Sequence, residues 1–460
     1  MKSSSTQSWD TDDLGSLDLG DKRRADRVRC FVSSHVQRPG GSIPQVSENS
    51  AEAKAYYRLL SNEAVEPDAI RASLQQAAVE RIDDEQLILV PQDTTTIDLS
   101  GLLATQGLGP LGGGDGTGGN GMFVHSAIAV TVDGVPLGLL HQQCWARTDQ
   151  VGSKHQRKQR PMQEKESYRW LQTSRAVEAA IDDDIALIQI GDRESDIFEL
   201  LAHKRRANSY LLLRAYQNRR IEGAEGLLWD EVAQMPPAAS FDLMVHPGPH
   251  ITVRKAHLQV RFSPVTIRPP ISGVHDQSLQ PVRVNAIEVR ETDAPEGVEP
   301  ICWRLLTDLP VQELDDVRRY VGYYEKRWLI ERYHYVLKSG CRIEHSQLRT
   351  FERLERLLVL LSAAALRLLW ITYSARANPD APCTVAFSDA EWHVLYRDAT
   401  HQEPPKRPPT LHQAVLWTAK LGGFLARKGD GEPGVKVLWR GMLALHYMVA
   451  GFLLASQTCG

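Results

Sequence analysis

Cysteine is scarce in this chain, with six residues among 460. Their spacing is wide and irregular and includes no Cys-x-x-Cys pair, at positions Cys30, Cys144, Cys302, Cys341, Cys383 and Cys459. Disulfide frameworks and structural zinc sites need close or regular cysteine spacing, so the sequence argues against both. We expect a protein that works in a reducing compartment.

A long uninterrupted apolar run is also missing. Residues Met1 to Gly15 are rich in Ser and Asp and contain no apolar stretch of the kind found in signal peptides. The most apolar helix candidate, Leu357–Trp370, carries Arg367 and is too short to cross a bilayer, so we predict a buried core helix there. The sequence therefore predicts a soluble cytoplasmic protein with no membrane partner.

No excess of one charge sign marks the chain as a whole, because 53 Lys and Arg residues face 57 Asp and Glu residues. Locally, cations predominate between Arg147 and Arg175, where only Asp149, Glu164 and Glu166 oppose them. Such a run is either a solvated loop or a segment that contacts phosphate groups, and the sequence leaves both interpretations open.

Residues 1–80 have the pattern of a small helical domain. Helical periodicity appears at Lys22–Val36, Ala51–Leu60 and Asp68–Arg81. The first two of these helices carry basic residues that include Arg24, Arg27 and Arg58. Small helical domains with a basic face often bind DNA, so we predict DNA binding here, although the sequence contains no clear helix-turn-helix signature.

Two apolar runs of strand length, Gln86–Asp93 and Ile185–Asp192, each end in an aspartate. Residues 81–216 as a whole alternate strand and helix patterns. A hairpin is predicted from Met122–Val132 and Val135–Trp145. Helices follow over about 163–182 and from Ser195 to about Arg206, and a further strand is predicted at Ser209–Tyr216. This order predicts an α/β domain with a mixed sheet flanked by helices. Because α/β sites lie at the carboxyl ends of strands, Asp93 and Asp192 are candidate site residues.

Two other features of this region receive no catalytic role. Gly101–Gly121 is rich in glycine but lacks the Lys-Ser/Thr pair that ends a phosphate-binding P-loop, so we predict a mobile loop. His125 lies within an apolar strand pattern, and we predict a structural histidine rather than a metal ligand.

The remainder of the chain divides into three parts. Residues 217–305 contain many prolines and alternating runs, which predict a β-rich insertion, and residues 306–375 resume the core. Residues 376–460 form a helical C-terminal region in which Pro379–Pro409 is mostly linker and helices lie around Lys420–Phe424 and over Leu438–Ala455. The last helix is more apolar than one core face requires, so either a partner subunit or the core of this chain covers it.

One stretch in the resumed core places a carboxylate among cations. Tyr324, Arg327, Glu331 and Lys338 follow the spacing Y-x2-R-x3-E-x6-K, and neither Pro nor Gly occurs between Tyr323 and Ser339. On an uninterrupted helix the four side chains fall within an arc of about 60°. The glutamate could then hold a cation while the Arg and Lys bind phosphate oxygens. Ordinary i,i+4 ion pairing on a solvated helix face would produce the same row, and this alternative stays open.

The three acids Asp93, Asp192 and Glu331, in this order and context, resemble the DDE transposases of insertion sequence family four, the transposon-five-like group. The resemblance covers nearly the whole chain and rests on these further motifs: Gly20-Asp-Lys-Arg-Arg24 with Arg27, Ala55-Tyr-Tyr-Arg58, Gln92-Asp93-Thr-Thr95, Val124-His-Ser126, Gly138-Leu-Leu-His-Gln142, Asp192-Arg-Glu-Ser-Asp196, Trp303-Arg-Leu-Leu-Thr307, Leu421-Gly-Gly-Phe424 and Leu438-Trp-x-Gly441. The glycine-rich loop, Cys144 and Tyr335 depart from the family pattern.

The resemblance implies a ribonuclease-H-like core that contains the β insertion, a DNA-binding N-terminal domain and a C-terminal dimerisation region. It implies two divalent metal ions, Mg²⁺ or Mn²⁺, bound by the catalytic residues Asp93, Asp192 and Glu331. Tyr324, Arg327 and Lys338 would hold phosphates, and Arg214 would contact DNA or form a structural ion pair. Trp303 would stack on a flipped base or pack in the core.

The implied activity is cut-and-paste transposition. A homodimer would pair two terminal inverted repeats of double-stranded DNA, excise the element by metal-dependent hydrolysis and end hairpins, and join the 3′ ends to target DNA of the bacterial nucleoid. Two alternatives share this fold: a domesticated DNA-binding protein that does not cut, and a metal-dependent nuclease without strand transfer.

Overall fold

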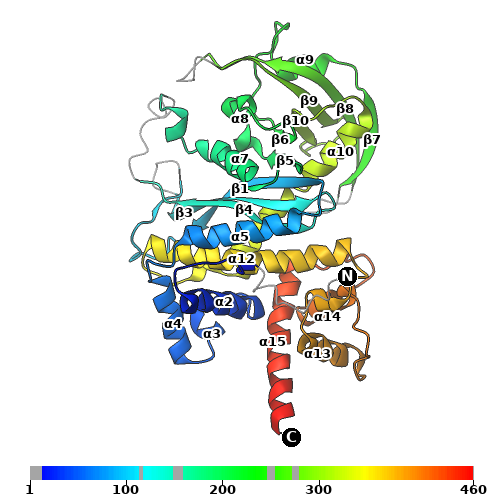
Figure 1. Cartoon of the computed structure of the whole chain (residues 1–460). Helices are drawn as coiled ribbons and strands as arrows, with labels where there is room; N and C mark the ends of the chain where they lie inside the picture. The colour runs from blue at the N-terminus through cyan, green and yellow to red at the C-terminus, as the bar shows by residue number, and fades with distance from the viewer. Residues whose placement is uncertain (1–12, 113–117, 149–158, 246–253, 272–278, 459–460) are drawn as a thin grey trace. The chain divides into compact units, whose positions relative to one another are not determined.

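The computed structural model describes residues 13–112, 118–148, 159–245, 254–271 and 279–458 (Figure 1). The chain divides into two compact units. Unit 1 contains Met1–Asp84, Thr94–Gln150 and Leu329–Gly460, and unit 2 contains Glu85–Asp93 and Val151–Trp328. The division follows packing and not chain order, because each unit is assembled from separate segments.

The N-terminal part of unit 1 is helical, as the sequence predicts. Its helices are α2 (Lys22–Gln37), α3 (Ile43–Val46), α4 (Ser50–Leu60) and α5 (Pro67–Ile82). The side chains of Asp21 and Asn49 accept backbone N–H bonds at the starts of α2 and α4, which explains why these helices begin where they do. Phe31 of α2 and Tyr56 of α4 are fully buried and meet edge to face at 5.0 Å between ring centroids.

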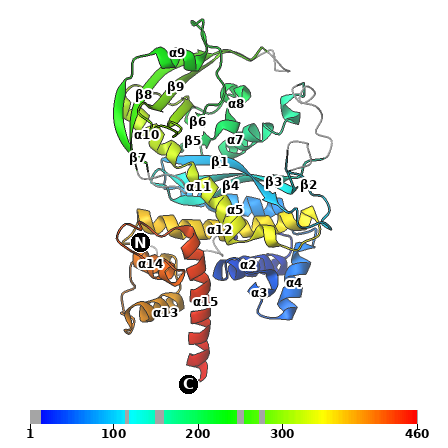
Figure 2. The same cartoon turned by 180° about the vertical axis from the view of Figure 1, so that it is seen from behind.

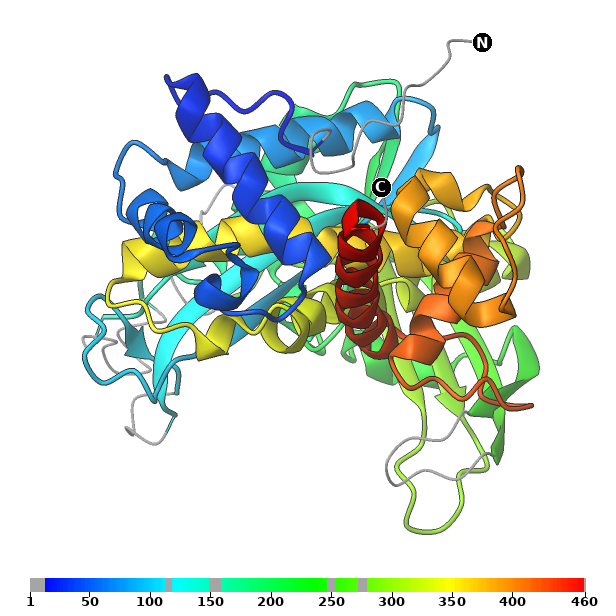
Figure 3. The ribbon, with the colours of Figure 1, turned by 90° about the horizontal axis from the view of Figure 1, so that it is seen from below.

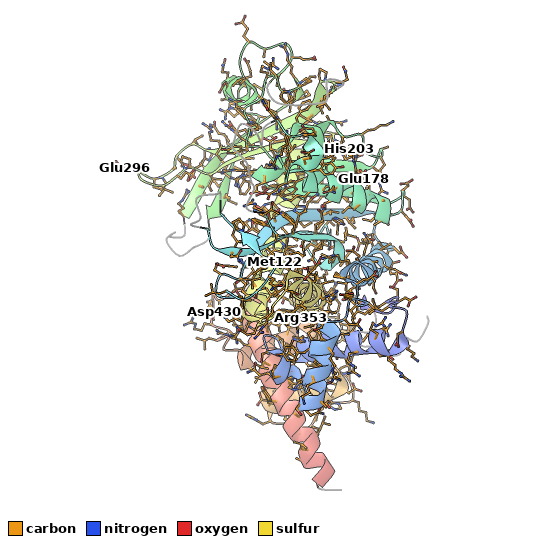
Figure 4. All side chains as sticks on the ribbon, turned by 90° about the vertical axis from the view of Figure 1, so that its left-hand side faces the viewer. Met122, Glu178, His203, Glu296, Arg353 and Asp430 are labelled. Atoms are coloured by element: carbon orange, nitrogen blue, oxygen red, sulfur yellow. The ribbon has the colours of Figure 1, made fainter. Side chains whose placement is uncertain are left out.

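The rest of unit 1 is built on a β-hairpin and one long helix. Strands β3 (Asn120–Thr131) and β4 (Pro136–Trp145) pair antiparallel, which confirms the predicted hairpin; Met122, near the start of β3, is labelled in Figure 4. The predicted buried helix is α12 (Phe351–Ala377), which packs against α2, α5 and β4 (Figure 1). It is longer than expected, with 27 residues, and is interior on nearly every face.

The glycine-rich segment is only partly the free loop that was expected. Residues 113–117 lie outside the described part of the chain. Before them, β2 (Gly109–Pro110) pairs with Gly121 and Asn120 of β3. Further backbone bonds hold Gln106 to Arg349 at 2.9 Å and Leu111 to Gly119 at 3.1 Å. The prediction of a mobile loop is wrong for these residues. Their backbone N–H and C=O groups pair with other segments, and such pairing leaves no hydrophobic pattern in the sequence.

The C-terminal region contains η5 (Cys383–Val385), α13 (Asp389–Thr400), α14 (Leu411–Leu421) and α15 (Val435–Thr458). The expectation of linker across Pro379–Pro409 is wrong, because a capping box of Ser388 and Glu391 starts α13 within it. The helix expected around Lys420–Phe424 ends at Leu421. Close helix packing requires glycine at positions 422 and 441. A Cβ on Gly422 or Gly441 would lie 1.8 Å from a carbonyl oxygen of the neighbouring helix.

Two helices of unit 1, α12 and residues Val435–Ala455 of α15, are long and apolar enough to cross a membrane by length and composition alone. For α12, 89% of the apolar window is buried inside the protein, as expected of a core helix. For α15 the buried share is 28%. Leu438 and Leu445 pack inward, whereas Tyr447 and Leu454 are exposed; Figure 3 shows α15 beside α13 and α14.

Unit 2 is built on one mixed sheet. Three neighbouring strands of this sheet are parallel: β1 (Leu87–Asp98), β5 (Ala186–Gly191) and β6 (Ser209–Arg214). Of β1, residues Leu87–Asp93 belong to unit 2. The sheet continues antiparallel through β10 (Cys302–Thr307), β9 (Val282–Glu291), β8 (Arg254–Ile267) and β7 (Ala239–Val245). The predicted β-rich insertion therefore extends the same sheet. Its strands enclose a buried carboxylate, Glu288, which pairs with Arg304 at 2.9 Å.

The helices of unit 2 are η1 (Met162–Glu164), α7 (Tyr168–Ala180), η2 (Arg193–Ser195), α8 (Phe198–Ala202), α9 (Leu228–Gln234) and α10 (Leu314–Glu325). The helix expected from Ser195 to about Arg206 is wrong in extent, since only α8 forms. Arg205 explains the early end: its guanidinium donates to the carbonyl of Leu200 at 2.9 Å and to that of His203 at 3.0 Å, so it satisfies the last carbonyls and closes the helix.

The buried imidazole of His35 in α2 makes the stability of unit 1 depend on pH. Its Nδ1–H donates to the Phe31 carbonyl at 2.9 Å, and burial lowers the pKa of His35 from 6.5 to about 4. Below pH 6.5 the unfolded chain therefore binds a proton that the folded chain does not bind until about pH 4. We expect the free energy of unfolding to fall by about 2 kcal/mol through this group between pH 7.5 and pH 5.

Urea unfolding of the wild type and of His35→Asn at both pH values tests this expectation. Asparagine keeps a donor near the Nδ1 position but does not titrate, so the variant should lose less stability on acidification than the wild type. His345→Gln, which removes an exposed histidine, is the matched control and should keep the wild-type dependence. An identical loss in wild type and His35→Asn would contradict the assignment.

Candidate active site

The two predicted aspartates of unit 2 lie in register on neighbouring parallel strands, with Asp192 directly after the end of β5. The expectation that the first strand ends at Asp93 is wrong, because β1 continues to Asp98. Strands β1 and β5 pair from Leu87 with Ala186 to Pro91 with Ile190, so each β5 residue follows its β1 partner by 99 positions. Asp192 likewise follows Asp93 by 99 positions, so the same register brings these two residues together just beyond the last pair. Neighbouring strands are about 4.8 Å apart, so the backbones of Asp93 and Asp192 are neighbours at the carboxyl end of β5.

Buried polar side chains secure this register beneath the carboxylates. Gln92 of β1 donates from Nε2 to Oε1 of Gln189 in β5 at 3.3 Å, and Gln189 donates in turn to Ser209 of β6 at 3.3 Å. All three side chains are buried. A one-residue slip of any strand would leave these groups without partners in the interior, which costs about 1–3 kcal/mol for each.

The turn that follows β5 fixes Asp192. Its side chain accepts the backbone N–H of Glu194 at 2.8 Å, and the hydroxyl of Ser195 donates to its carbonyl oxygen at 2.5 Å. The preceding residue has to be glycine, because a Cβ on Gly191 would lie 2.3 Å from the Ser195 hydroxyl oxygen. The turn therefore holds the Asp192 backbone in one position.

Asp196, four residues later, has a structural role that the sequence analysis missed. Its carboxylate accepts the backbone N–H groups of Tyr216 at 2.8 Å and Gln217 at 2.7 Å, and it pairs with Arg219 at 2.7 Å. These bonds tie the turn after β5 to the segment after β6. The only signal in the sequence was the presence of Asp196 in the five-residue motif that begins with Asp192.

Tyr324, Arg327 and Arg214 gather near Asp192 in unit 2. Burial raises the pKa of Tyr324, the negative charge of Asp192 acts in the same direction, and the positive charges of Arg327 and Arg214 oppose it. The Arg327 guanidinium carbon lies 5.8 Å from the centre of the Tyr324 ring and 5.4 Å from that of Trp328. The structure thus brings Arg327, Arg214 and Asp192 close enough to Tyr324 for their charges to act on its hydroxyl.

Trp303 lies on β10 at the edge of this group. It pairs with Val289 of β9 and is half-buried. Its neighbour Arg304 reaches the opposite face of the sheet, where it pairs with Glu288 and lies over the ring of Trp229 at 5.2 Å. Arg214, at the end of β6, donates to the carbonyl of Cys302 at 3.4 Å. Trp303 therefore belongs to the strand that Arg214 contacts.

The expectation that Tyr324, Arg327, Glu331 and Lys338 share one continuous helix face is wrong. Helix α10 ends at Glu325, and i→i+3 bonds of 3.0 Å at Lys326 and Arg327 form a tight turn before α11 (Trp328–Tyr335). A π-helical segment, η3 (Val336–Gly340), follows, with the N–H of Cys341 bonded to the carbonyl of Val336 at 2.7 Å. Tight turns and π-helices rotate each residue by amounts other than 100°, so the 100° spacing of one uninterrupted helix does not describe these four residues.

Glu331 and Lys338 belong to unit 1. Glu331 is half-buried on α11. The ammonium of Lys338 donates to the Thr96 carbonyl of β1 at 2.8 Å and pairs with Glu344 at 3.3 Å. Glu344, which precedes His345 in the short helix η4 (Ile343–His345), also accepts the backbone N–H of Asp98 at 3.0 Å. Lys338 is thus held at the part of β1 that follows Asp93.

The basic residues predicted in the N-terminal helices also come together. Arg24 and Arg27 of α2 and Arg58 of α4 line one hollow of about 280 Å³ on unit 1, together with Asp21, Arg23 and Asn62. The guanidinium of Arg24 donates to the carbonyl of Leu19. Arginines around a hollow of this size offer several charged donors to phosphate groups.

The side chains of the site suit a hard divalent cation. Asp93 and Asp192 supply adjacent carboxylate oxygens, the ligands that Mg²⁺ and Mn²⁺ prefer. Across the part of the chain that the structure describes, no three His, Cys, Asp or Glu side chains form a group that could hold a metal ion. Among the described cysteines, Cys341 is buried, and burial raises the pKa of its thiol to about 12.

Three regions of the chain match models of known protein families. Residues 6–65 match a family described as Transposase DNA-binding, and this span includes Arg24, Arg27 and Arg58. Residues 188–368 match the Transposase DDE domain, a family that implies dependence on divalent metal ions, and this span includes Asp192 and Glu331. Residues 363–458 match the Transposase Tn5 dimerisation domain.

The three matches follow one another in the order DNA-binding, catalytic and dimerisation, and together they span both ends of the chain. They agree with the helical N-terminal region, the mixed α/β sheet of the catalytic region and the helical C-terminal region of the structure. They also support DNA binding and dimer formation by this chain. The protein belongs to the Tn5-like DDE transposases.

Proposed function

We propose that Asp93, Asp192 and Glu331 are the catalytic carboxylates of this transposase and that they hold two divalent ions, Mg²⁺ or Mn²⁺. The observation that carries the proposal is the register of β1 and β5, which sets two aspartates on neighbouring strands at the carboxyl end of β5. Held by these carboxylates, such ions would supply activation of a water or a 3′-hydroxyl and stabilisation of the leaving oxygen in a phosphoryl transfer.

Glu331 supplies the third carboxylate in this proposal. It follows Arg327 by four residues, across the turn that leads into α11. Arg327 in turn lies against Tyr324, whose pKa responds to the charge of Asp192. The short chain connection between Arg327 and Glu331 supports a role for both residues in the same reaction.

The surrounding residues of this chain bind and orient the DNA. Arg327, Lys338 and Tyr324 hold phosphates beside the cleaved bond, Arg214 contacts the strand, and Trp303 stacks on a base flipped from the end. Arg24, Arg27 and Arg58 hold the inverted repeat. Two ends paired by a homodimer are excised by hydrolysis and end hairpins, and their 3′ ends are joined to target DNA in the cytoplasm, on the nucleoid.

Loss of any one carboxylate should abolish cleavage and leave end binding intact. For Asp93→Ala, Asp192→Ala and Glu331→Ala we expect cleavage to fall at least about 10³-fold, because each variant removes a metal ligand. Cleavage of a plasmid that carries the DNA ends flanking the coding frame measures the rate, and gel-shift titration of one end measures binding.

Glu194→Ala is the matched control for the carboxylates. Glu194 is an exposed acid in the turn after Asp192, where it pairs with Arg169 at 2.6 Å, and its loss should change cleavage little. Asp192→Cys adds a second check, since a thiolate ligand should lose Mg²⁺-supported cleavage and recover part of it with Mn²⁺. Near wild-type, Mg²⁺-dependent cleavage by any one of the three alanine variants would overturn the assignment.

Removing the phosphate-binding cations should slow chemistry more than binding. For Arg327→Ala and Lys338→Ala we expect hairpin formation and end processing to slow about 10²-fold, the usual effect of losing a group that stabilises transition-state charge. Affinity for the intact end should change by less than about threefold, because many other phosphate contacts remain. Single-turnover kinetics on bound ends separates the two quantities.

Glu344→Gln distinguishes phosphate binding by Lys338 from its structural ion pair. This variant breaks the pair with Lys338 and keeps the ammonium, so end processing should stay close to the wild-type rate. If Glu344→Gln slows processing as much as Lys338→Ala, or if Lys338→Ala weakens binding and processing equally, Lys338 does not have the assigned role.

A further inference from the structure

A buried polar cluster in unit 1 joins three elements that are far apart in the sequence. The Nε2 of Gln142 on β4 lies 3.0 Å from the hydroxyl oxygen of Tyr333 on α11 and 3.2 Å from that of Ser362 on α12. It also lies 3.3 Å from the hydroxyl of Ser126 on β3. We call Gln142, Tyr333 and Ser362 the α11 clamp; Figure 2 shows the three elements that supply it.

The α11 clamp is fully inside the protein. Tyr333 and Ser362 are 0% exposed and Gln142 is 3% exposed. Ser362 uses its own proton to bond the Leu358 carbonyl at 2.9 Å, so its oxygen remains available to accept from Gln142. Hydrogen bonds in such an interior are strong and directional, and a hydroxyl left without its partner is costly. The clamp therefore favours one orientation of α11 over its neighbours.

Tyr333 and Glu331 project from opposite sides of α11. Two residues along an α-helix are about 200° apart, so the side that carries Tyr333 into the interior directs Glu331 the other way. The burial of the two residues agrees, because Tyr333 is completely enclosed and Glu331 is half-buried. A group that fixes the direction of Tyr333 also fixes the direction of Glu331.

The rotation of α11 needs such a restraint. The helix has only eight residues and lies between a tight turn and the π-helical η3. Leu329 and Ile330 make the apolar contacts that hold α11 against the core. Apolar packing is less directional than hydrogen bonding, so these contacts oppose removal of the helix from the core more than they oppose its rotation. A carboxylate lies about 6 Å from a helix axis, so a rotation of about 20° would move it by about 2 Å. Displacements of this size are enough to disturb a metal ligand or a reaction.

We propose that the α11 clamp sets the rotation of α11 and thereby aims the Glu331 carboxylate, which makes Tyr333 a positioning residue for metal binding. The inference rests on the proposed function, in which Glu331 is a metal ligand. Tyr333 itself touches neither metal nor DNA. Its hydroxyl acts through the helix that it anchors, as groups behind a metal ligand commonly do.

Tyr333→Phe tests the proposal, because it removes one oxygen and keeps the ring in its pocket. We expect Mn²⁺ binding to the full-length protein, measured from the electron paramagnetic resonance signal of free Mn²⁺, to weaken about tenfold. The Mg²⁺ concentration for half-maximal cleavage should rise by a similar factor. Gln142→Leu should do the same, and the double variant should be no worse than the weaker-binding single variant, since the three groups act as one unit.

Tyr56→Phe is the matched control. Tyr56 is also 0% exposed, and its hydroxyl bonds Ser34 at 3.1 Å and Glu52 at 2.9 Å on α2 and α4. This variant loses a buried hydroxyl of the same kind in the same unit, so its melting temperature should fall about as far as that of Tyr333→Phe. Its Mn²⁺ affinity should stay at the wild-type value.

The outcomes separate this inference from the function on which it rests. Unchanged Mn²⁺ affinity in Tyr333→Phe, or an equal loss in Tyr56→Phe, would overturn the α11 clamp as a positioning device even when Glu331→Ala is inactive. Mg²⁺-dependent cleavage by Glu331→Ala at the wild-type rate would instead overturn the proposed function. Weaker Mn²⁺ binding in Tyr333→Phe with wild-type binding in Tyr56→Phe supports the inference.

Discussion

The parallel pairing of β1 with β5 is the constraint on which the catalytic region depends. Two aspartates almost a hundred residues apart become neighbours only while this register is kept, and the buried bonds of Gln92, Gln189 and Ser209 oppose any slip. The turn that follows β5 then holds Asp192, and Asp196 ties that turn to the end of the next strand. Carboxylates repel each other, so a rigid scaffold is needed to keep Asp93 and Asp192 close.

The site residues that follow along the chain are held by a different means. Around α11 the backbone changes from a tight turn to an α-helix and then to a π-helix within a few residues. Irregular hydrogen bonding of this kind often occurs at functional positions, because it redirects side chains that a regular helix would align. Lys338 leaves the π-helical segment to bond the carbonyl of Thr96, which links it to the strand that contains Asp93. Side-chain contacts, more than helix geometry, determine where these groups point.

The C-terminal region shows how the same chain serves assembly. Gly422 and Gly441 let α14 and α15 approach until their backbones touch, so the start of α15 is firmly attached. Towards its end α15 exposes large apolar side chains, among them Leu453 and Leu454. An exposed apolar surface of this kind generally meets a partner. The match of residues 363–458 to the Transposase Tn5 dimerisation domain supports dimer formation by this chain.

The sequence by itself determined the helices with strong periodicity, the apolar strand patterns that lead to Asp93 and Asp192, and the acidic and basic residues that mark the family, because these signals are local. It did not determine that β1 continues past Asp93 to Asp98. Nor did it determine the extent of α8, the helix α13 within a proline-rich segment, or the interruption of the row from Tyr324 to Lys338. The two helices depend on single side-chain bonds to nearby backbone, such as Arg205 with the Leu200 carbonyl and Glu391 with the Ser388 N–H, which hydrophobic periodicity does not show. Lys338 is instead held by a bond to the distant carbonyl of Thr96. Only the tertiary structure revealed that Gln142, Tyr333 and Ser362 meet, since three polar residues on separate elements become partners only when packing excludes water around them.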